Sequence, residues 1–478
     1  MTKHLLTLSI HSLAHDGRGI ACGNAATVMG KIIFVSGALP GDNVRARLLG
    51  VKKSFVEAET LEFLSRSQAI APQCPHWEHC GGCPLQCMAY PEQLRWKKIL
   101  AEENLTRIGR LERGRLRKIF PPVEPSPNLR QFRNKMEFAF DADRTGTVIA
   151  GLRERRTGNI LAVPGCMLMP PEALSLAQKA AEFVQNGRLA PYGHARRGFW
   201  RFLTIREAYT TEDAAGPKWF CLCLTSPGAS KEHRIVRKLG ERLLGEFSSM
   251  ATFVHEERKN RDTVSTGQKR IIALNAQGQS KAEAVMLHLP LGGKMFGLDI
   301  ASFFQVNTGA AETLAGLAQD FFNDAGSAAL LDAYCGVGVP GLLLAPRSEN
   351  VFGFDRDKRA VALARDNASR MGLTHCRYTT ADAVDILSDG AASYGTVLLD
   401  PPRAGIQTEA LAALMTQRPQ HILYISCNPA TLARDAALMA KSYSLERLAG
   451  ADIFPHTPGL ECVSLWRKKE RGKFAETD

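Results

Sequence analysis

The chain has 478 residues and carries 60 lysines and arginines against 48 aspartates and glutamates, so its formal net charge is +12. Hydrophobic residues make up 45% and charged residues 23% of the sequence, which is the balance of globular domains and excludes wholesale disorder, collagen-like repetition and a coiled coil. The length predicts about two to four domains, each with its own core.

The sequence indicates a cytoplasmic protein with a polyanionic partner. It contains no run of about 20 uninterrupted apolar residues, and polar residues interrupt the opening segment where a signal peptide would be apolar. We therefore expect cytoplasmic localisation and no membrane partner. Because thiols stay reduced in that compartment, the 12 cysteines indicate metal binding or catalysis rather than disulfides. The basic excess suits RNA, although a modest excess is also a common solubility feature.

Residues 1–65 are predicted to form a small all-β unit. Short β-rich runs at residues 31–35, 43–48 and 54–60 alternate with turn signals such as Asp16-Gly17. This pattern favours an OB-like barrel. Basic side chains are interleaved with the runs, as a face that follows a phosphate backbone requires.

Residues 66–120 combine a cysteine-rich segment, a helix expected at residues 91–108 and a basic stretch. Three of the cysteines follow the spacing C-x5-C-x2-C, a fourth follows nearby, and a fifth lies in a later turn: Cys74, Cys80, Cys83, Cys87 and Cys166. Four thiolates hold either tetrahedral zinc or an iron–sulfur cluster. The spacing alone favours zinc.

Residues 121–300 begin with a Pro-rich linker and then have the pattern of a mixed α/β domain, with strand-like runs near residues 135–140, 202–206 and 219–224. From residue 301 to residue 478, strands alternate with amphipathic helices. That alternation predicts a parallel, doubly wound α/β domain.

A Gly-rich turn follows the strand in residues 328–338 and predicts a nucleotide-type site. Gly336 and Gly338 allow the backbone to approach a ligand closely, and the next strand ends in Asp355, whose carboxylate suits a ribose diol. The third glycine that lines a pyrophosphate is absent. The turn therefore favours S-adenosylmethionine over a dinucleotide.

Two further strands run into Asp400-Pro-Pro-Arg403 and into the turn that contains Cys427. Ligands of open α/β sheets lie beyond the carboxyl ends of the strands, so we expect these turns to converge with the Gly-rich turn. In that crevice, before a helix start that can lower a thiol pKa, Cys427 is favoured as a catalytic residue over an inert core cysteine. Glu461, in an apolar loop shaped by Pro and Gly, is a candidate general base.

These residues resemble the RNA uracil-C5 methyltransferase family, in particular its bacterial 23S ribosomal RNA branch, and the first domain is similar to the TRAM RNA-binding module. The resemblance extends over nearly the whole chain. The motifs that carry it are Asp16-Gly-Arg-Gly-Ile20, Phe34-Val-Ser-Gly-Ala-Leu-Pro-Gly-Asp-Asn-Val44, Phe132-Arg-Asn-Lys135, Phe304-Gln-Val-Asn307, Asp400-Pro-Pro-Arg-Ala-Gly405 and Ser426-Cys-Asn-Pro-Ala-Thr-Leu-Ala-Arg-Asp435.

The resemblance implies a Rossmann-like class I methyltransferase domain in residues 301–478. It implies Cys427 as the nucleophile and Glu461 as the base. The residues that it implies around S-adenosylmethionine are Gln305, Tyr334, Asp355 and Asp400, with Asp382 near the adenine. It further implies a [4Fe-4S] cluster, in place of zinc, on Cys74, Cys80, Cys83 and Cys166. The chain departs from the family pattern at Gly459, where His is frequent, and at Val339, where Asn is common in the rRNA branch.

The implied activity is methyl transfer to C5 of a uridine in 23S rRNA, without an obligate protein partner. A thiolate that adds to C6 makes C5 nucleophilic, and a base then removes the C5 proton. Arg403 is placed to steady the charge that develops at O4. The uridine has to leave its stack to reach the thiol, and a single-stranded loop makes that step easier.

Several alternatives are open. The same reaction on tRNA is the first, although that branch commonly lacks the TRAM-like domain and the cysteine cluster. Cytosine-C5 methylation would place the nucleophile in an Asp-x-Pro-Cys turn, and adenine-N6 methylation needs neither Cys427 nor Glu461. Radical chemistry typically uses C-x3-C-x2-C spacing. A non-catalytic RNA-binding or assembly factor is the alternative that Gly459 and Val339 leave open.

Overall fold

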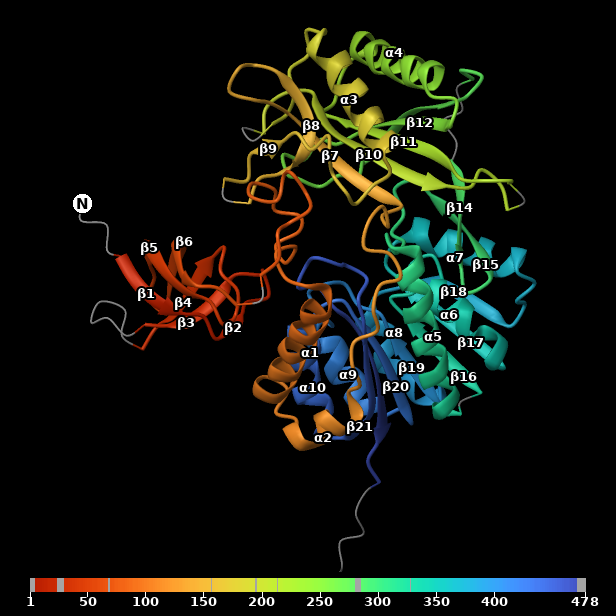
Figure 1. Cartoon of the computed structure of the whole chain (residues 1–478). Helices are drawn as coiled ribbons and strands as arrows, with labels where there is room; N and C mark the ends of the chain where they lie inside the picture. The colour runs from red at the N-terminus through yellow and green to blue at the C-terminus, as the bar shows by residue number, and fades with distance from the viewer. Residues whose placement is uncertain are drawn as a thin grey trace, which may run out of the picture.

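The computed structural model describes residues 5–23, 30–67, 69–155, 157–193, 196–212, 214–279, 285–326 and 328–470. Within these residues the chain forms a six-stranded sheet, two seven-stranded sheets and a two-stranded hairpin. Figure 1 shows the N-terminal sheet at the left, the second sheet at the top and the C-terminal sheet at the bottom.

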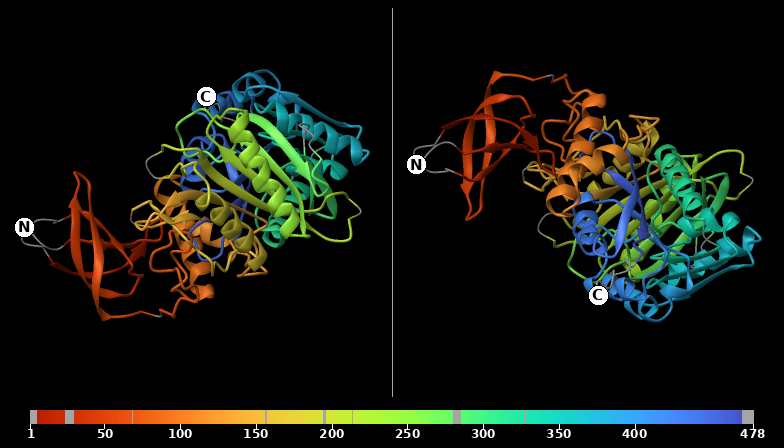
Figure 2. Two further views of the ribbon diagram at one scale, coloured as in Figure 1. Left: turned by 90° about the horizontal axis from the view of Figure 1, so that it is seen from above. Right: turned by 90° about the horizontal axis from the view of Figure 1, so that it is seen from below.

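The N-terminal sheet has the strand order β1-β5-β6-β4-β3-β2. Side chains alternate between buried and exposed along β1, and the buried ones, such as Leu8, Ile33 and Val44, form a core of their own. Figure 2 shows this sheet projecting from the rest of the molecule. The OB-like barrel stays a prediction for this all-β unit. Its strands are β1 (Leu5–Ser9), β2 (Ser12–Leu13), β3 (Gly19–Cys22), β4 (Ile32–Ser36), β5 (Asn43–Val51) and β6 (Phe55–Ser65).

The cysteine segment leads into α1 (Tyr90–Arg107), close to the helix expected at residues 91–108, and α2 (Arg113–Ile119). Pro91 lies in the first turn of α1, where its missing N–H is tolerated. Buried side chains of both helices, among them Ala101 and Leu116, belong to the same core as the C-terminal sheet. The two helices thus attach the cysteine segment to the C-terminal domain.

The second sheet has the order β13-β12-β11-β10-β7-β8-β9, with β11 and β12 parallel and the other pairs antiparallel. The helices α3 (Pro171–Gln185) and α4 (Ser230–Glu246) pack on it around a core that contains Trp200 and Phe253. Its strands are β7 (Lys135–Ala142), β8 (Val148–Arg153), β9 (Ile160–Leu161), β10 (Trp200–Ala208), β11 (Lys218–Thr225), β12 (Met250–Glu257) and β13 (Lys269–Asn275).

A hairpin of β14 (Met286–Leu291) and β15 (Lys294–Asp299) connects the second sheet with the C-terminal domain. Leu287 and Leu298 of the hairpin share one core cluster with Phe220 of the second sheet and Val361 of the C-terminal domain. The two domains therefore share apolar packing. The predicted domain boundaries at residues 65, 120 and 300 stay predictions.

The C-terminal sheet has the order β18-β17-β16-β19-β20-β22-β21. All pairs are parallel except those of β22 with β20 and with β21, which confirms the predicted α/β sheet. The order reverses between β16 and β19, where such sheets bind ligands. Its strands are β16 (Ala329–Ala333), β17 (Asn350–Asp355), β18 (Cys376–Thr380), β19 (Thr396–Leu399), β20 (His421–Ser426), β21 (Tyr443–Ala451) and β22 (Glu461–Lys468).

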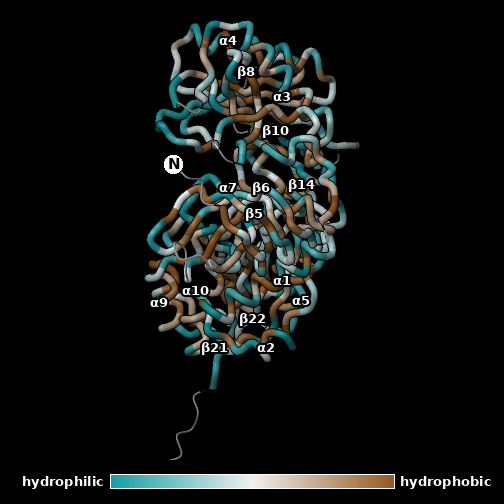
Figure 3. The backbone as a smooth tube through the Cα atoms, turned by 60° about the vertical axis from the view of Figure 1, so that its left-hand side comes forward, coloured by the Kyte–Doolittle hydropathy of each residue, from teal (hydrophilic) through white to brown (hydrophobic). Residues whose placement is uncertain are grey.

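Helices separate the strands of this sheet. Figure 3 shows hydrophobic and hydrophilic stretches alternating along the backbone, as expected for strands buried between amphipathic helices. Among the described residues, none of the helices is both long and apolar enough to cross a bilayer. The helices are α5 (Thr308–Ala325), α6 (Val339–Leu344), α7 (Lys358–Arg370), α8 (Ala383–Asp389), α9 (Thr408–Gln417) and α10 (Pro429–Met439), with short turns η1 (Ala345–Arg347) and η2 (Ala391–Ser393).

Candidate active site

Five of the predicted site residues lie at the carboxyl ends of parallel strands in the C-terminal sheet. Asp355 ends β17, and the other four follow the last residues of β16, β18, β19 and β20: Tyr334, Asp382, Asp400 and Cys427. The carboxyl ends of parallel strands meet at one edge. The fold therefore brings these side chains to one edge of the sheet, where the sequence predicts a ligand crevice.

The Gly-rich turn has the backbone geometry of a ligand-binding loop. Tyr334, Gly336 and Gly338 have φ values of 63°, 54° and 87°, and glycine adopts this left-handed region without steric cost. The Gly336 N–H donates to Oδ2 of Asp355 at 3.1 Å, and the Asp357 N–H donates to Oδ1 at 2.9 Å. The turn and the strand that follows thus fix the Asp355 carboxylate at this edge of the sheet.

Tyr334 supplies a polar group that faces three carboxylates. Burial, followed by the charges of Asp382, Asp435 and Asp355, raises the pKa of Tyr334 to about 12. Its buried hydroxyl has no hydrogen-bond partner among the described residues. Asp382 accepts the Val384 N–H at 2.9 Å as the N-cap of α8. The Tyr334 hydroxyl is therefore free for a ligand on this side of the crevice.

Gln305 lies in the segment before α5, beside a second motif from the central domain. Asn134 donates from Nδ2 to the Gln305 carbonyl and to Oγ1 of Thr308, each at 3.0 Å. Asn307 then caps α5 by accepting the Ala310 N–H at 3.2 Å. Hydrogen bonds thus join the motif at residues 132–135 to the motif at residues 304–307 and to Thr308, which begins α5, although the two motifs are far apart in the sequence.

Cys427 and Glu461 lie side by side at the same sheet edge. In the antiparallel pair β20–β22, Ser426 lies opposite Cys462, so the residues that flank this pair are neighbours. Glu461 is only 3% exposed. Burial, followed by the charge of Asp400, raises the pKa of Glu461 to about 8, against the opposing effect of Arg403. Burial also raises the pKa of Asp400 to about 7.

The expectation that a helix start lowers the pKa of Cys427 is wrong for this structure. Burial is the largest cause of a rise of the pKa of Cys427 to about 11, and the carboxyl groups of Glu461 and Asp400 add to it. Arg403 acts in the opposite direction but does not compensate. α10 begins two residues after Cys427, but burial, reinforced by the two carboxyl groups, outweighs any effect of that helix start.

The turn that carries Arg403 is fastened to α10. Arg434 donates from Nη1 to the Ala404 carbonyl at 3.0 Å and from Nη2 to the Ile406 carbonyl at 2.9 Å. Asp435 accepts the Ile406 N–H at 3.2 Å and the Tyr424 hydroxyl at 2.8 Å. These bonds hold the Asp400–Arg403 turn in register with Cys427, which precedes the same helix.

A cleft of about 1240 Å³ leads from the active-site residue Arg403 to the N-terminal sheet. Its walls include Arg18 and Arg47 of that sheet, Trp77 of the cysteine segment and Arg133 and Lys135 of the central domain. Acidic residues line it as well, and Glu57, Glu59 and Glu137 pair with Arg18, Arg47 and Lys135. Cationic and aromatic side chains together are the surface that single-stranded nucleic acids require. We therefore identify this cleft as the candidate nucleic-acid interface.

Phe303 in this cleft was missed by the sequence reasoning. Its side chain is 76% exposed, although Phe304 next to it is buried at 2%. An exposed aromatic residue in a cleft lined by charged side chains is a surface on which a base can stack. The signal in the sequence is the adjacent Phe-Phe pair, of which the structure buries Phe304 and leaves Phe303 exposed.

Cys74, Cys80, Cys83 and Cys166 line one small cavity of about 20 Å³, whereas Cys87 is not among its lining residues. Burial and the neighbouring thiols raise the pKa of Cys83 to about 12. The Gly82 N–H donates to the Cys80 sulfur at 3.4 Å. Within the described residues, no group of three His, Cys, Asp or Glu side chains is arranged to hold a single metal ion. A four-iron cluster binds each thiolate through a different iron, so it needs a wider arrangement.

Comparisons with known proteins relate the chain to RNA methyltransferases. A family model described as tRNA (Uracil-5-)-methyltransferase matches residues 267–469. An uncharacterized RNA methyltransferase of Nitratidesulfovibrio vulgaris is 34% identical to this chain, and the match covers 97% of this chain and 96% of that protein. An uncharacterized RNA methyltransferase of Gloeobacter violaceus is 31% identical, and the match covers 96% of this chain and 95% of that protein. The fold is similar to that of the Pyrococcus abyssi tRNA (uracil-54, C5)-methyltransferase, crystallised with S-adenosyl-L-homocysteine, with a TM-score of 0.73 and 24% identity over 96% of this chain and 99% of that one.

Proposed function

The chain belongs to the RNA uracil-C5 methyltransferase family, and on that premise we propose that it transfers a methyl group from S-adenosylmethionine to C5 of a uridine in 23S rRNA. The observation that carries this proposal is the pairing of Cys427 with the buried Glu461 at the carboxyl edge of the sheet. A nucleophile beside a base is the arrangement that covalent activation of an unreactive carbon requires.

In the proposed mechanism, the Cys427 thiolate adds to C6 of the uracil and makes C5 nucleophilic. S-adenosylmethionine, when bound, supplies the electrophilic methyl group. The Glu461 carboxylate then removes the C5 proton, the C5–C6 double bond forms again, and the C–S bond to Cys427 breaks. Because the pKa of Glu461 is raised to about 8, the group is a stronger base than an ordinary carboxylate.

The surrounding residues have supporting roles in this proposal. Arg403 lies close enough to oppose the burial-driven rise of the pKa values of Cys427 and Glu461, and we assign it to the negative charge that develops on the uracil ring. Tyr334, Asp355, Asp382, Asp400 and Gln305 are assigned to S-adenosylmethionine. The cleft receives the RNA, whose target uridine turns out of its stack toward Cys427. This assignment includes a cytoplasmic location, where ribosomal RNA is found.

A tRNA substrate is the second candidate. The similarity to the Pyrococcus abyssi enzyme covers 99% of that chain, so a protein named for tRNA has the same overall architecture. The N-terminal unit and the cysteine segment therefore do not by themselves discriminate rRNA from tRNA. We place 23S rRNA first because of the motifs that resemble the bacterial rRNA branch.

Methyl transfer to defined transcripts tests the proposed function and its substrate. Unmodified 23S rRNA and a pool of unmodified tRNAs are incubated separately with the protein and S-adenosylmethionine carrying a labelled methyl group. We expect label in 5-methyluridine of the rRNA at a rate at least about tenfold above that in tRNA. Faster labelling of tRNA would replace the first substrate by the second, and no labelled 5-methyluridine in either RNA would contradict the reaction.

We further propose that Cys74, Cys80, Cys83 and Cys166 bind a [4Fe-4S] cluster. Four thiols line one cavity of about 20 Å³, which has to widen to admit a four-iron cluster, and their mutual repulsion as thiolates favours a cationic centre. Burial raises the pKa of Cys80, and the N–H group of Gly82 and the guanidinium group of Arg155 only partly oppose this rise. Because the proposed reaction transfers no electrons, we assign a structural or RNA-contacting role to the cluster.

Anaerobic purification tests the cluster. We expect a brown protein with broad absorbance near about 400 nm and about four irons and four acid-labile sulfides per chain. Cys166→Ser should lose most of this iron, whereas Cys87→Ser, which removes a thiol outside the cavity, should retain it. A colourless wild-type protein with stoichiometric zinc would replace the cluster by a zinc site on the same thiols.

A further inference from the structure

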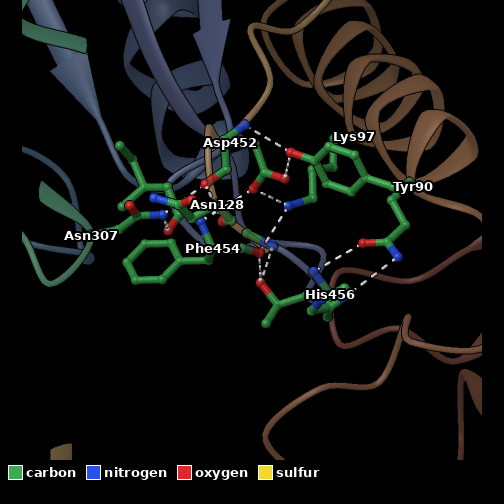
Figure 4. Close-up of polar contacts among 12 residues, drawn as sticks. Tyr90, Lys97, Asn128, Asn307, Asp452, Phe454 and His456 are labelled. Atoms are coloured by element: carbon green, nitrogen blue, oxygen red, sulfur yellow. Dashed lines mark hydrogen bonds and ion pairs between the residues drawn. The ribbon is translucent and has the colours of Figure 1, made fainter. Parts of the chain in front are cut away.

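The helix α1 has buried polar residues on one face. Tyr90, Gln93 and Lys97 recur at helical spacing, and Gln93 and Lys97 are each only 1% exposed. A helix that packs on a core normally buries apolar side chains on such a face. Figure 4 shows Tyr90 and Lys97 directed at the loop that contains Asp452, Phe454 and His456. This loop joins β21 to β22, so it ends directly before Glu461.

Lys97 makes a completely buried ion pair with Asp452. The distance from Nζ to Oδ1 is 2.5 Å, and both side chains are 0% exposed. Lys97 also donates to the Phe454 carbonyl at 3.0 Å, and Tyr90 donates its hydroxyl proton to Oδ2 of Asp452 at 2.9 Å. A buried ion pair is a poor source of stability, because desolvation offsets much of the attraction. Its directional bonds, however, define one position of the loop.

Gln93 fastens the next turn of the same loop. Its Oε1 accepts the His456 N–H at 2.9 Å, and its Nε2 donates to the Met88 carbonyl at 2.8 Å. The backbone of His456 has a φ of +68°, which is uncommon for a residue other than glycine and needs support from its surroundings. The His456 carbonyl in turn accepts the N–H of Leu85, two residues after Cys83. The loop is therefore bonded to both α1 and the cysteine segment.

The other side of the loop is bonded to the segment that contains Gln305. Asn307 donates from Nδ2 to the Ile453 carbonyl and to Oγ of Ser126, each at 3.0 Å, as Figure 4 shows for the labelled Asn307. Glu461, at the end of the loop, pairs with Ala451 at its beginning. The loop is thus a junction between α1, the cofactor-side segment and the proposed base.

We propose that Lys97, together with Tyr90 and Gln93, positions Glu461 for the removal of the C5 proton. The proposal rests on the proposed function. In the step concerned, the C5–H electron pair forms the C5–C6 double bond, the proton goes to the Glu461 carboxylate, and the C6–S bond breaks to return the Cys427 thiolate. Displacement of the loop affects this step most, because Cys427 belongs to a different loop, after β20.

The positioning role is tested by comparing methyl transfer, which precedes proton removal, with the amount of covalent RNA–protein complex, which accumulates when proton removal is slow. In Lys97→Met, we expect the rate of single-turnover transfer of labelled methyl groups to RNA to fall less than about threefold. The fraction of RNA that is covalently bound to protein on a denaturing gel should rise about tenfold above wild type. A purely structural role would slow both steps together and leave this fraction unchanged. Either an unchanged fraction or a fall in it would overturn the proposal.

Two further variants keep the test decisive. Lys97→Met/Asp452→Asn leaves no isolated charge in the interior, so it should fold even where the single variant does not, and we expect the same rise in covalent complex. Arg95→Met, on the exposed side of α1 with a local pair to Glu92, is the matched control and should behave as wild type. A double variant with the wild-type covalent fraction would also overturn the proposal.

The outcome separates failure of this proposal from failure of the proposed function. If the wild-type protein transfers no methyl group to RNA, the proposed function fails before the variants are compared. If the wild type is active and Lys97→Met releases its product as quickly as Arg95→Met does, only the positioning role fails.

Discussion

Cys427→Ala abolishes methyl transfer in the proposed mechanism, with an expected loss of about 10⁴-fold or more. The alanine has no sulfur to add to C6, and without that addition C5 of uracil is a poor nucleophile. With RNA that contains 5-fluorouracil, the wild-type protein should form a covalent complex that survives denaturation, because the fluorine at C5 cannot leave as a proton does. The variant should form no such complex.

Cys376→Ala is the matched control for this prediction. Cys376 opens β18, so it belongs to the same sheet as Cys427 but lies at the amino end of its strand, away from the crevice. We expect wild-type methyl transfer and wild-type formation of the fluorouracil complex. A covalent complex that persists in Cys427→Ala would show that another group attacks C6, and equal loss in both variants would indicate damage to the sheet.

The sequence was sufficient to predict the residues at strand ends. Asp355 and Cys427 each follow an apolar run with a turn signal, and the geometry of parallel sheets brings such positions together without any further information. The role of Glu461 was harder to predict from the sequence, because an isolated glutamate normally lies on the protein surface. Its burial depends on β20 and β21, which pair with β22 on either side, so it depends on tertiary pairing that the residues around Glu461 do not indicate.

Electrostatic effects between distant segments could not be predicted. The start of α10 after Cys427 is visible in the sequence and suggests a lowered thiol pKa. The structure adds burial, the largest cause, and then the charges of Glu461 and Asp400, from β22 and the end of β19, and together they raise the pKa of Cys427 to about 11. A local pattern identifies the helix terminus, whereas the opposing charges depend on the register of three strands.

The buried ion pair between Lys97 and Asp452 could not be predicted from the sequence either, although Lys97 lies in a helix. The polar residues of α1 have the pattern of a solvated helix face, and nothing near Lys97 in the sequence indicates that its charge is buried. The partner lies beyond β21, at the other end of the chain. Only the packing of α1 against the C-terminal domain reveals that Tyr90, Gln93 and Lys97 face one loop.

Glu461→Gln separates the removal of the C5 proton from the steps before it. We expect the variant to form the methylated covalent complex with ordinary uracil RNA, and to release the product on the order of 10² to 10³ times more slowly than wild type. Thiolate formation should not suffer, because the carboxyl group of Glu461 is one cause of the raised pKa of Cys427. A denaturing gel of labelled RNA, followed over time, measures both steps.

The pH dependence of product release provides an independent check on the same residue. Glu461 accepts a proton only as a carboxylate, and burial raises its pKa to about 8, so release by the wild-type protein should become faster as the pH rises through about 8. In Glu461→Gln no carboxyl group titrates at this position, and this rise should be lost. Rapid release by Glu461→Gln, with the wild-type pH profile, would contradict Glu461 as the base and would favour Asp400, whose pKa is raised to about 7 in the same crevice.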